Sequence, residues 1–134
     1  MEANFELFEE GQVELTRERV HVTLNGACRL FFNARALSAL GDPDGVALLF
    51  DRQRQIIGVM PAALNKKHAY RLRNREGASY SRVITVKNFC RHYAIKPEGT
   101  LAFPSASVNK DGILMLDLQQ AEAVTRQRRN ATAE

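Results

Sequence analysis

Residues 30–41 read LFFNARALSALG, and this stretch decides the fold because an apolar segment runs directly into a small amphipathic helix. Asn33 suits the N-cap position, since its side-chain oxygen can accept a backbone N–H of the first turn. Gly41 suits the helix end, where a left-handed backbone conformation is common. One face of the helix would carry the apolar residues Ala36, Leu37 and Leu40. The stretch therefore predicts a strand that enters a two-turn helix over residues 34–40.

The same pattern returns about fifty residues later, where residues 83–94 read VITVKNFCRHYA. A helix is expected there over residues 87–93. Each copy is followed by a turn containing proline, an acidic residue and glycine, at 42–45 and 95–99, and then by two apolar runs around a polar turn. The chain therefore predicts two tandem strand-helix-hairpin repeats.

The remaining elements follow from β-branched alternation and turn residues. We expect strands at residues 20–24, 28–32, 45–50, 55–60, 70–75, 80–86, 100–108 and 112–118. Asn25-Gly26 predicts a two-residue type I′ turn, and Pro104 predicts an edge or bulge within its strand. Residues 119–129 predict a short terminal helix.

These elements predict an α+β fold that is mostly β, in which the two repeats face each other as a small β-barrel. The expected organisation is an acidic N-terminal lead-in at 1–19, repeat 1 at 20–61, a linker at 62–68, repeat 2 at 69–118, and a C-terminal helix and tail at 119–134. The helices are small, so most of the core must come from the sheets packing on each other.

Composition is typical of one folded domain, with 45% hydrophobic residues in 134. No apolar run approaches the roughly 18 residues that a membrane span needs. The N-terminus is acidic where a signal peptide would be basic, so we expect a cytoplasmic protein. Cys28 and Cys90 stand at non-equivalent places in the two halves, which predicts free thiols and no disulfide.

The charge is unevenly distributed along the chain, although the net value is only +4. Residues 66–96 contain nine bases and one acid, Glu76, whereas the first thirty residues contain six acids and three bases. Such segregation is typical of a surface that binds a polyanion, with nucleic acid the usual partner. The alternative is a solvated basic face without a partner.

The repeated pattern resembles the swapped-hairpin fold of AbrB-like and MraZ-like proteins. The resemblance covers roughly residues 20–118, and residues 82–86 (RVITV) and 95–100 (IKPEGT) come closest to the family pattern. The proline that usually opens the helix is replaced by Asn33 in one copy and by Val86 or Lys87 in the other, and neither half contains the Asp-x-x-x-Arg signature of MraZ. The resemblance implies a barrel of interlocked hairpins, a homo-oligomer, and binding of double-stranded DNA as a transcription regulator or antitoxin.

Arg71, Arg73 and Arg75 alternate along one expected strand and would therefore point to the same face. Arginine suits phosphate or guanine because its donors form a planar fork. The patch would be extended by five further cations: Arg82, Lys87, Arg91, Lys66 and Lys67. These eight residues are the predicted nucleic-acid contacts. The alternative is that the arginines protect an exposed sheet edge from aggregation.

No motif points to an enzyme, a metal site or a cofactor. The three histidines are scattered, and no phosphate loop or nucleophile elbow is present. The sequence therefore predicts a duplex-DNA-binding regulator or antitoxin without a cofactor. Two alternatives remain open: a protein-interaction module whose basic face binds an acidic partner, and a single-stranded nucleic-acid binder in which Tyr70 and Tyr80 stack on bases.

Overall fold

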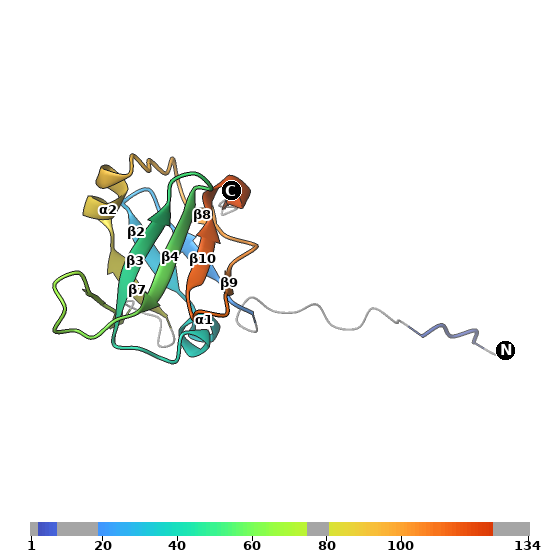
Figure 1. The fold of residues 1–134 in the computed structure, drawn as a ribbon. Helices are drawn as coiled ribbons and strands as arrows, with labels where there is room; N and C mark the ends of the chain where they lie inside the picture. Colours follow the sequence, from blue (N-terminus) through green and yellow to red (C-terminus); the bar gives the residue numbers. More distant parts are fainter. Residues whose placement is uncertain (1–2, 8–18, 75–80, 125–134) are drawn as a thin grey trace.

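The computed structural model describes residues 3–7, 19–74 and 81–124, and it consists of two antiparallel sheets and two short helices (Figure 1). The first half of the chain contributes β1 (Val22–Leu24), β2 (Arg29–Phe32), α1 (Ala34–Ala39), β3 (Gly45–Asp51) and β4 (Ile56–Pro61). The second half contributes β5 (Tyr70–Arg71), β6 (Arg73–Asn74), β7 (Arg82–Thr85), α2 (Lys87–His92), β8 (Leu101–Ala102), β9 (Ser107–Val108), β10 (Leu114–Asp117), a 3₁₀ helix (Leu118–Gln120) and β11 (Glu122–Ala123). The expected mostly-β fold is confirmed.

Strands from both halves of the chain share each sheet. One sheet has the order β11-β8-β1-β2-β7-β6 and the other β5-β3-β4-β10-β9. At the centre of the first, β2 pairs antiparallel with β7, and Leu30 lies opposite Ile84. In the second, β4 pairs antiparallel with β10, and Ile57 lies opposite Leu116. Among the described residues this pairing gives two sheets and no closed barrel.

Two segments that were expected to be single strands instead pass from one sheet to the other. Residues 70–74 break at the buried Leu72, so that β5 joins β3 whereas β6 joins β7. Residues 101–108 break around Pro104, so that β8 joins β1 whereas β9 joins β10. The predictions of continuous strands at 70–75 and 100–108 were therefore wrong, because local alternation cannot show where a chain changes its pairing partner.

The core lies between the two sheets and is filled by the inward-facing residues of the central strands. Val22, Leu24, Leu30 and Phe32 come from the first sheet, and Ile57, Val59, Leu114 and Leu116 from the second, all at most 1% exposed. Alternation of apolar and polar residues places these side chains on one face of each strand. Burial of this apolar area is the main favourable term in folding.

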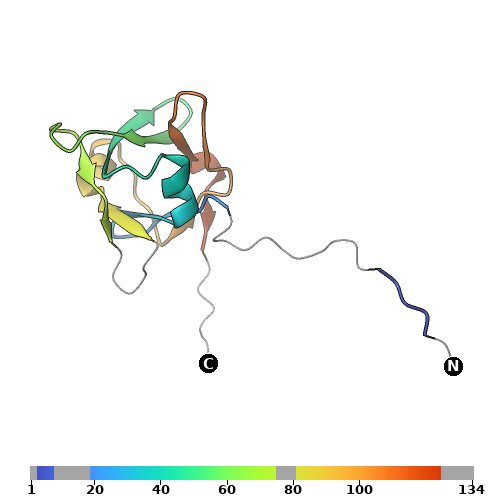
Figure 2. The same cartoon turned by 90° about the horizontal axis from the view of Figure 1, so that it is seen from below.

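The two helices lie at opposite ends of the sheets, α1 across the lower end and α2 at the upper end (Figures 1 and 2). Asn33 caps α1 as predicted, because its Oδ1 accepts the Ala36 N–H at 2.9 Å. The N-cap of α2 is Val86, which offers no side-chain hydrogen bond. Both helices are held to the core by short buried faces, Ala36 and Leu37 on α1 and Phe89 and Cys90 on α2.

Both helices also end in the same backbone motif. The Asp42 N–H donates to Leu37 O at 2.8 Å, and the Ile95 N–H donates to Cys90 O at 2.8 Å. The preceding residue is left-handed in each case, with φ of 86° at Gly41 and 54° at Ala94. This is the Schellman arrangement, in which a left-handed residue lets the chain satisfy the last carbonyls of a helix.

The hairpin predicted at Asn25-Gly26 is present, but its turn type was wrong. The Asn25 N–H donates to Arg29 O at 3.1 Å, which makes a three-residue loop, and the positive φ (61°) falls on Cys28. Such a loop is a type I turn followed by a left-handed residue. The Asn25 side chain stabilises this loop, because its Oδ1 accepts the Ala27 and Arg29 N–H groups, both at 3.0 Å.

At the two ends of the chain the structure departs from the predictions or does not test them. Residues 118–123 form a 3₁₀ helix and the strand β11, which pairs with β8, so the α-helix expected from residue 119 was wrong over this part. Most of the acidic lead-in, and residues 125–134, lie outside the described residues. No helix within the described ranges is long and apolar enough to cross a membrane.

Candidate nucleic-acid interface

Helix α2 presents four adjacent polar side chains on its outer face. Lys87, Asn88, Arg91 and His92 are all exposed, whereas Phe89 and Cys90 face the core and are 8% and 2% exposed. Because positions three and four residues apart are neighbours on a helix, the four side chains form one continuous surface. All four can donate hydrogen bonds, and two of them carry a fixed positive charge.

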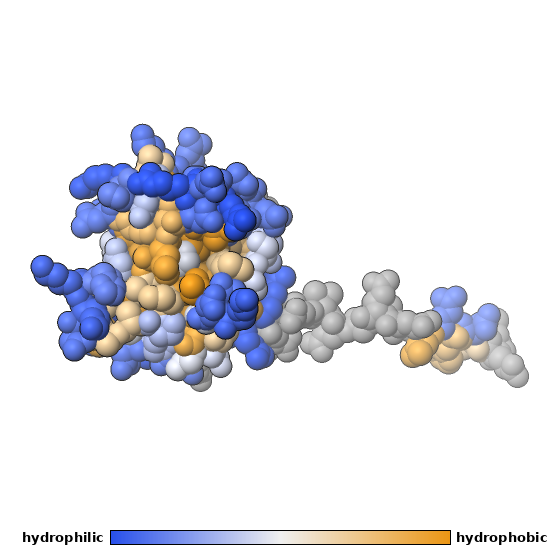
Figure 3. All heavy atoms as spheres, in the orientation of Figure 1, coloured by the Kyte–Doolittle hydropathy of each residue, from blue (hydrophilic) through white to orange (hydrophobic). Residues whose placement is uncertain are grey.

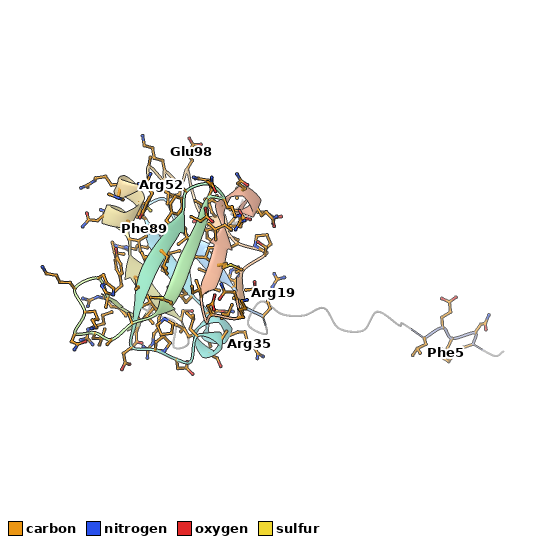
Figure 4. The ribbon with its side chains drawn as sticks, viewed as in Figure 1. Phe5, Arg19, Arg35, Arg52, Phe89 and Glu98 are labelled. Atoms are coloured by element: carbon orange, nitrogen blue, oxygen red, sulfur yellow. The ribbon has the colours of Figure 1, made fainter. Side chains whose placement is uncertain are left out.

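An aromatic cluster beneath α2 fixes its position on the second sheet. The Phe50 ring from β3 lies 4.5 Å from the Tyr93 ring and 5.9 Å from the Phe89 ring, measured between centroids. The Phe89 and Tyr93 rings are 4.9 Å apart. Arg52 Cζ lies 4.8 Å from the Tyr93 ring centre, which is cation–π geometry (Arg52 and Phe89 are labelled in Figure 4). The polar face is therefore carried by a rigidly packed element.

A hollow on each side of α2 widens this surface. The first has a volume of about 460 Å³ and separates α2 from residues 67–70. Its lining includes Lys67, His68, Tyr70, Asn88, His92 and Tyr93. Its walls thus combine aromatic rings with an amide and a cation. Burial raises the pKa of Tyr70, with a smaller contribution from Cys90, so its hydroxyl stays protonated and can act as a donor at neutral pH.

The second hollow, of about 580 Å³, lies between α2 and the β1–β2 turn. Lys87, Arg91 and Lys96 line it together with the two cysteines. Both thiols are free, as predicted, and they lie in hydrogen-bond contact with each other. Burial, the hydrogen bond that the Cys90 thiol donates to Cys28, and the nearby Cys28 sulfur raise the pKa of Cys90 to about 12, in that order of importance. Cys90 is therefore a neutral thiol at the floor of a cationic hollow.

The predicted arginine row is present in part. Arg71 and Arg73 are exposed on either side of the buried Leu72, which is the alternation that the sequence predicted. Their strand changes sheets at Leu72, so Arg71 belongs to the edge of one sheet and Arg73 to the edge of the other. Arg75 lies outside the described residues. Arg82 is half-buried on β7, where it pairs with Asn74 of β6.

The other predicted contacts divide between α2 and the linker. The structure brings Lys67 and α2 to the same hollow, although they are twenty residues apart in sequence. Lys66 is exposed beside Lys67, and Lys87 and Arg91 line the second hollow. Sequence reasoning missed Asn88 and His92 as members of the polar face. The spacing of Lys87, Asn88, Arg91 and His92 on a helix could have shown that these four residues lie together.

The two basic segments contain no acid of their own. Residues 66–74 and 81–96 contain eight cations and no acid: Lys66, Lys67, Arg71, Arg73, Arg82, Lys87, Arg91 and Lys96. None of these cations has an ion-pair partner within the described ranges, where Arg54 and Asp51 form an ion pair at 3.9 Å. Strand pairing divides these cations: Lys87, Arg91 and Lys96 lie beside α2, whereas Arg71 lies opposite Gly45 and Arg82 opposite Phe32, at the strand ends nearer α1. A cation without an ion-pair partner is free to pair with an external anion.

The described residues contain no group of three or more histidine, cysteine, aspartate or glutamate side chains placed to hold a metal ion. Comparison of the chain with protein-family models, with curated proteins and with solved structures gave no significant match.

Proposed function

We propose that this protein binds double-stranded DNA through the outer face of α2 and the basic segment 66–73, as a regulator or antitoxin of AbrB-like type. The observation that carries the proposal is the polar outer face of α2, a rigidly packed helix, together with the basic segments 66–74 and 81–96, which contain eight cations without ion-pair partners among the described residues and no acid. Phosphate contacts supply most of the affinity for DNA and require cations held on a defined surface. The proposed role is binding and not catalysis.

The dimensions of α2 suit this role. A helix of six residues rises about 9 Å, and the major groove is about 12 Å wide, so the whole polar face fits within the groove. Asn88 and Arg91 carry the side chains that pair best with adenine and guanine edges. Lys66, Lys67, Arg71 and Arg73 would then contact the phosphates on one side of the groove.

We also propose that the two halves are structural repeats in a swapped-hairpin-like barrel. Three observations support this: the shared Schellman ends of α1 and α2, the antiparallel pairing of β2 with β7, and the antiparallel pairing of β4 with β10. In each of these pairs one strand comes from each half, as a two-fold relation between the halves requires. The segments 70–74 and 101–108, which pass between the sheets, would form the corners of the barrel.

The test is fluorescence-anisotropy binding of random duplex and single-stranded oligonucleotides at two salt concentrations. The informative variants are K87A/R91A on α2 and R71A/R73A/R75A on the arginine row. We expect each to weaken duplex binding by more than tenfold without lowering thermal stability. R35A/K110A is the matched control, because it removes two exposed cations elsewhere, with Arg35 on α1 at the opposite end of the molecule (Figure 4).

Duplex binding that falls steeply with salt and weakens in the α2 variant supports the proposal. No duplex binding by the wild type at low salt overturns it. Equal weakening by the control double variant also overturns it, because binding would then follow net charge and not this surface.

A second candidate function, single-stranded nucleic-acid binding, is favoured by the hollow between α2 and residues 67–70. Tyr70, His92 and Tyr93 could stack on an unpaired base there, while Lys67 contacts phosphate and Asn88 hydrogen-bonds to the base edge. Tyr80 lies outside the described residues. A preference for single-stranded over duplex oligonucleotides, abolished by Y70A, would favour this candidate over the first.

The third candidate is a protein-interaction module whose basic face binds an acidic partner. The acidic N-terminal residues of a neighbouring copy offer such a charge pattern. Binding to neither oligonucleotide, followed by salt-sensitive binding to a peptide of residues 1–19, would favour it.

A further inference from the structure

The outer face of the second sheet is apolar, although it does not face the core. Leu49, Gly58 and Met115 stand in register across β3, β4 and β10, on the side opposite to Leu48, Val59 and Leu114. Ala47 and Met60 form the next row on the same outer side. Figure 3 shows the result as an apolar area in the middle of the front face, bordered by polar residues.

This composition is unusual for an antiparallel sheet with one face in water. Such a sheet normally alternates apolar residues toward the core with polar residues toward solvent. Here Leu49 is 38% exposed and Met60 and Met115 are half-buried, and the Asn109 side chain lies 3.8 Å from Met115 Sδ. A contiguous apolar patch with a polar rim marks an interaction surface.

On this face the exposed Leu49 side chain lies next to a hollow. Gly58 lies between Leu49 and Met115, and a hollow of about 300 Å³ opens beside it, lined also by Ile56 and Ile113. A β-carbon built on Gly58 would lie 3.0 Å from Ile113 Cγ2 and 3.3 Å from Leu49 Cβ, so a side chain at this position would fill the floor of the hollow. The exposed Leu49 stands directly next to it.

The rim carries charges of both signs. Asp51 and Asp117 flank Ile56 across the sheet, and Arg54 in the adjoining turn lies 3.9 Å from Asp51. Arg52 belongs to the same turn. A partner of a single charge sign would leave half of this rim unmatched, whereas a second copy of the same rim can pair acid with base.

We propose that the protein forms a homodimer through the outer faces of β3, β4 and β10. In an isologous contact the same patch is used by both copies, so Leu49 of each copy enters the hollow beside Gly58 of the other. Methionine is suited to such a surface because its flexible side chain fills irregular gaps. This surface does not include α2, so the proposal is independent of nucleic-acid binding.

The experiment is sedimentation velocity of the full chain from low to high micromolar concentration. We expect the wild type to sediment as a dimer and L49D to sediment as a monomer, with half the mass. V124D is the matched control, because Val124 is 43% exposed, close to the 38% of Leu49, but follows β11 in the other sheet. Circular dichroism and thermal unfolding show whether each variant is folded, and M115K serves as the second face variant if L49D unfolds.

The proposal is overturned if the wild type sediments as a monomer at every concentration. A dimer that persists in the folded L49D and M115K variants overturns it too, as does a dimer that V124D dissociates equally. A dimer lost in the face variants and retained in V124D supports it.

Discussion

At the residue scale, the two helices differ in the residue that follows the C-terminal end of each. Gly41 and Ala94 occupy the same left-handed position, with φ of 86° and 54°. An alanine pays a steric cost there that glycine does not. At this position α2 therefore carries a small strain that α1 avoids, although Asp42, the next residue after α1, is itself left-handed with φ of 51°.

We expect A94G to stabilise the protein by about 0.5 to 1 kcal/mol, and G41A to destabilise it by about 1 kcal/mol. A β-carbon on Gly41 has no other atom within 4 Å, so the effect of G41A is purely conformational. Denaturant unfolding measures both values. A39G is the control, because Ala39 is exposed within α1 and glycine there should destabilise by about 1 kcal/mol. Destabilisation by A94G would show that Ala94 is not strained.

The two thiols should differ in reactivity. The pKa of Cys90, raised to about 12, leaves on the order of one thiolate in ten thousand at pH 8, and its side chain is 2% exposed. Cys28 is half-buried at the edge of the second hollow. We expect iodoacetamide to label one cysteine, Cys28, in the native protein and both in denaturant. Peptide mass spectrometry assigns the sites, and rapid native labelling of Cys90 would contradict the arrangement.

At the element scale, Asn33 joins α1 to the segment that enters β1. Its Oδ1 accepts the Ala36 N–H at 2.9 Å and the His21 N–H at 3.1 Å, and its Nδ2 donates to Arg19 O at 2.7 Å. Each of these bonds satisfies a backbone group that would otherwise depend on water. The Asn33 side chain therefore both caps α1 and hydrogen-bonds to the backbone of the segment before β1.

We expect N33A to lower the free energy of unfolding by about 2 kcal/mol, because the cap and the two further hydrogen bonds are lost together. N33S should recover part of this loss, since a serine hydroxyl can still accept the Ala36 N–H. N88A is the control for replacing an asparagine that is exposed on a helix, and it should change stability by less than about 0.5 kcal/mol. An equal loss of stability in N33S and N33A would indicate that capping contributes little and that the hydrogen bond to Arg19 O accounts for most of the loss.

At the scale of the whole molecule, the charge distribution predicts how DNA binding should depend on salt. If about six of the eight cations contact phosphates, the logarithm of the binding constant should fall with the logarithm of salt concentration with a slope of about −5. K87A should reduce the steepness by about 1, whereas N88A should change the affinity for particular sequences and leave the slope unchanged. Anisotropy titrations over a range of salt concentrations measure both. A slope near zero would exclude phosphate contacts as the source of affinity.

The sequence predicted those elements whose cause is local. The β3–β4 hairpin and α1 lie within one residue of the expected bounds, because apolar runs, an N-cap and a C-terminal glycine all act within a few residues. The turn at residues 25–28 was misjudged because Asn-Gly is compatible with more than one hairpin loop, and the pairing of Asn25 with Arg29 selects among them. β11 was missed because it exists through its pairing with β8.

The same division applies to the candidate site. A run of basic residues is visible in the chain, and the alternation of Arg71 and Arg73 around Leu72 follows from strand geometry alone. Two contacts of the site depend on the tertiary structure. Cys28 contacts Cys90 because β2 pairs with β7. Lys67 faces α2 across a hollow because of where residues 62–70 return to the sheet. These are contacts between residues distant in sequence, and no local pattern encodes them.

The sequence by itself thus determined most of the strands, the two short helices, the charged and apolar character of each segment, and the Asn33 cap, because these depend on side-chain chemistry and short-range sterics. The tertiary structure alone decided which strands pair, where residues 70–74 and 101–108 pass between sheets, and that the outer face of β3, β4 and β10 is left apolar. The physical reason is that strand pairing depends on the burial of the whole core, which brings together residues that are distant in sequence.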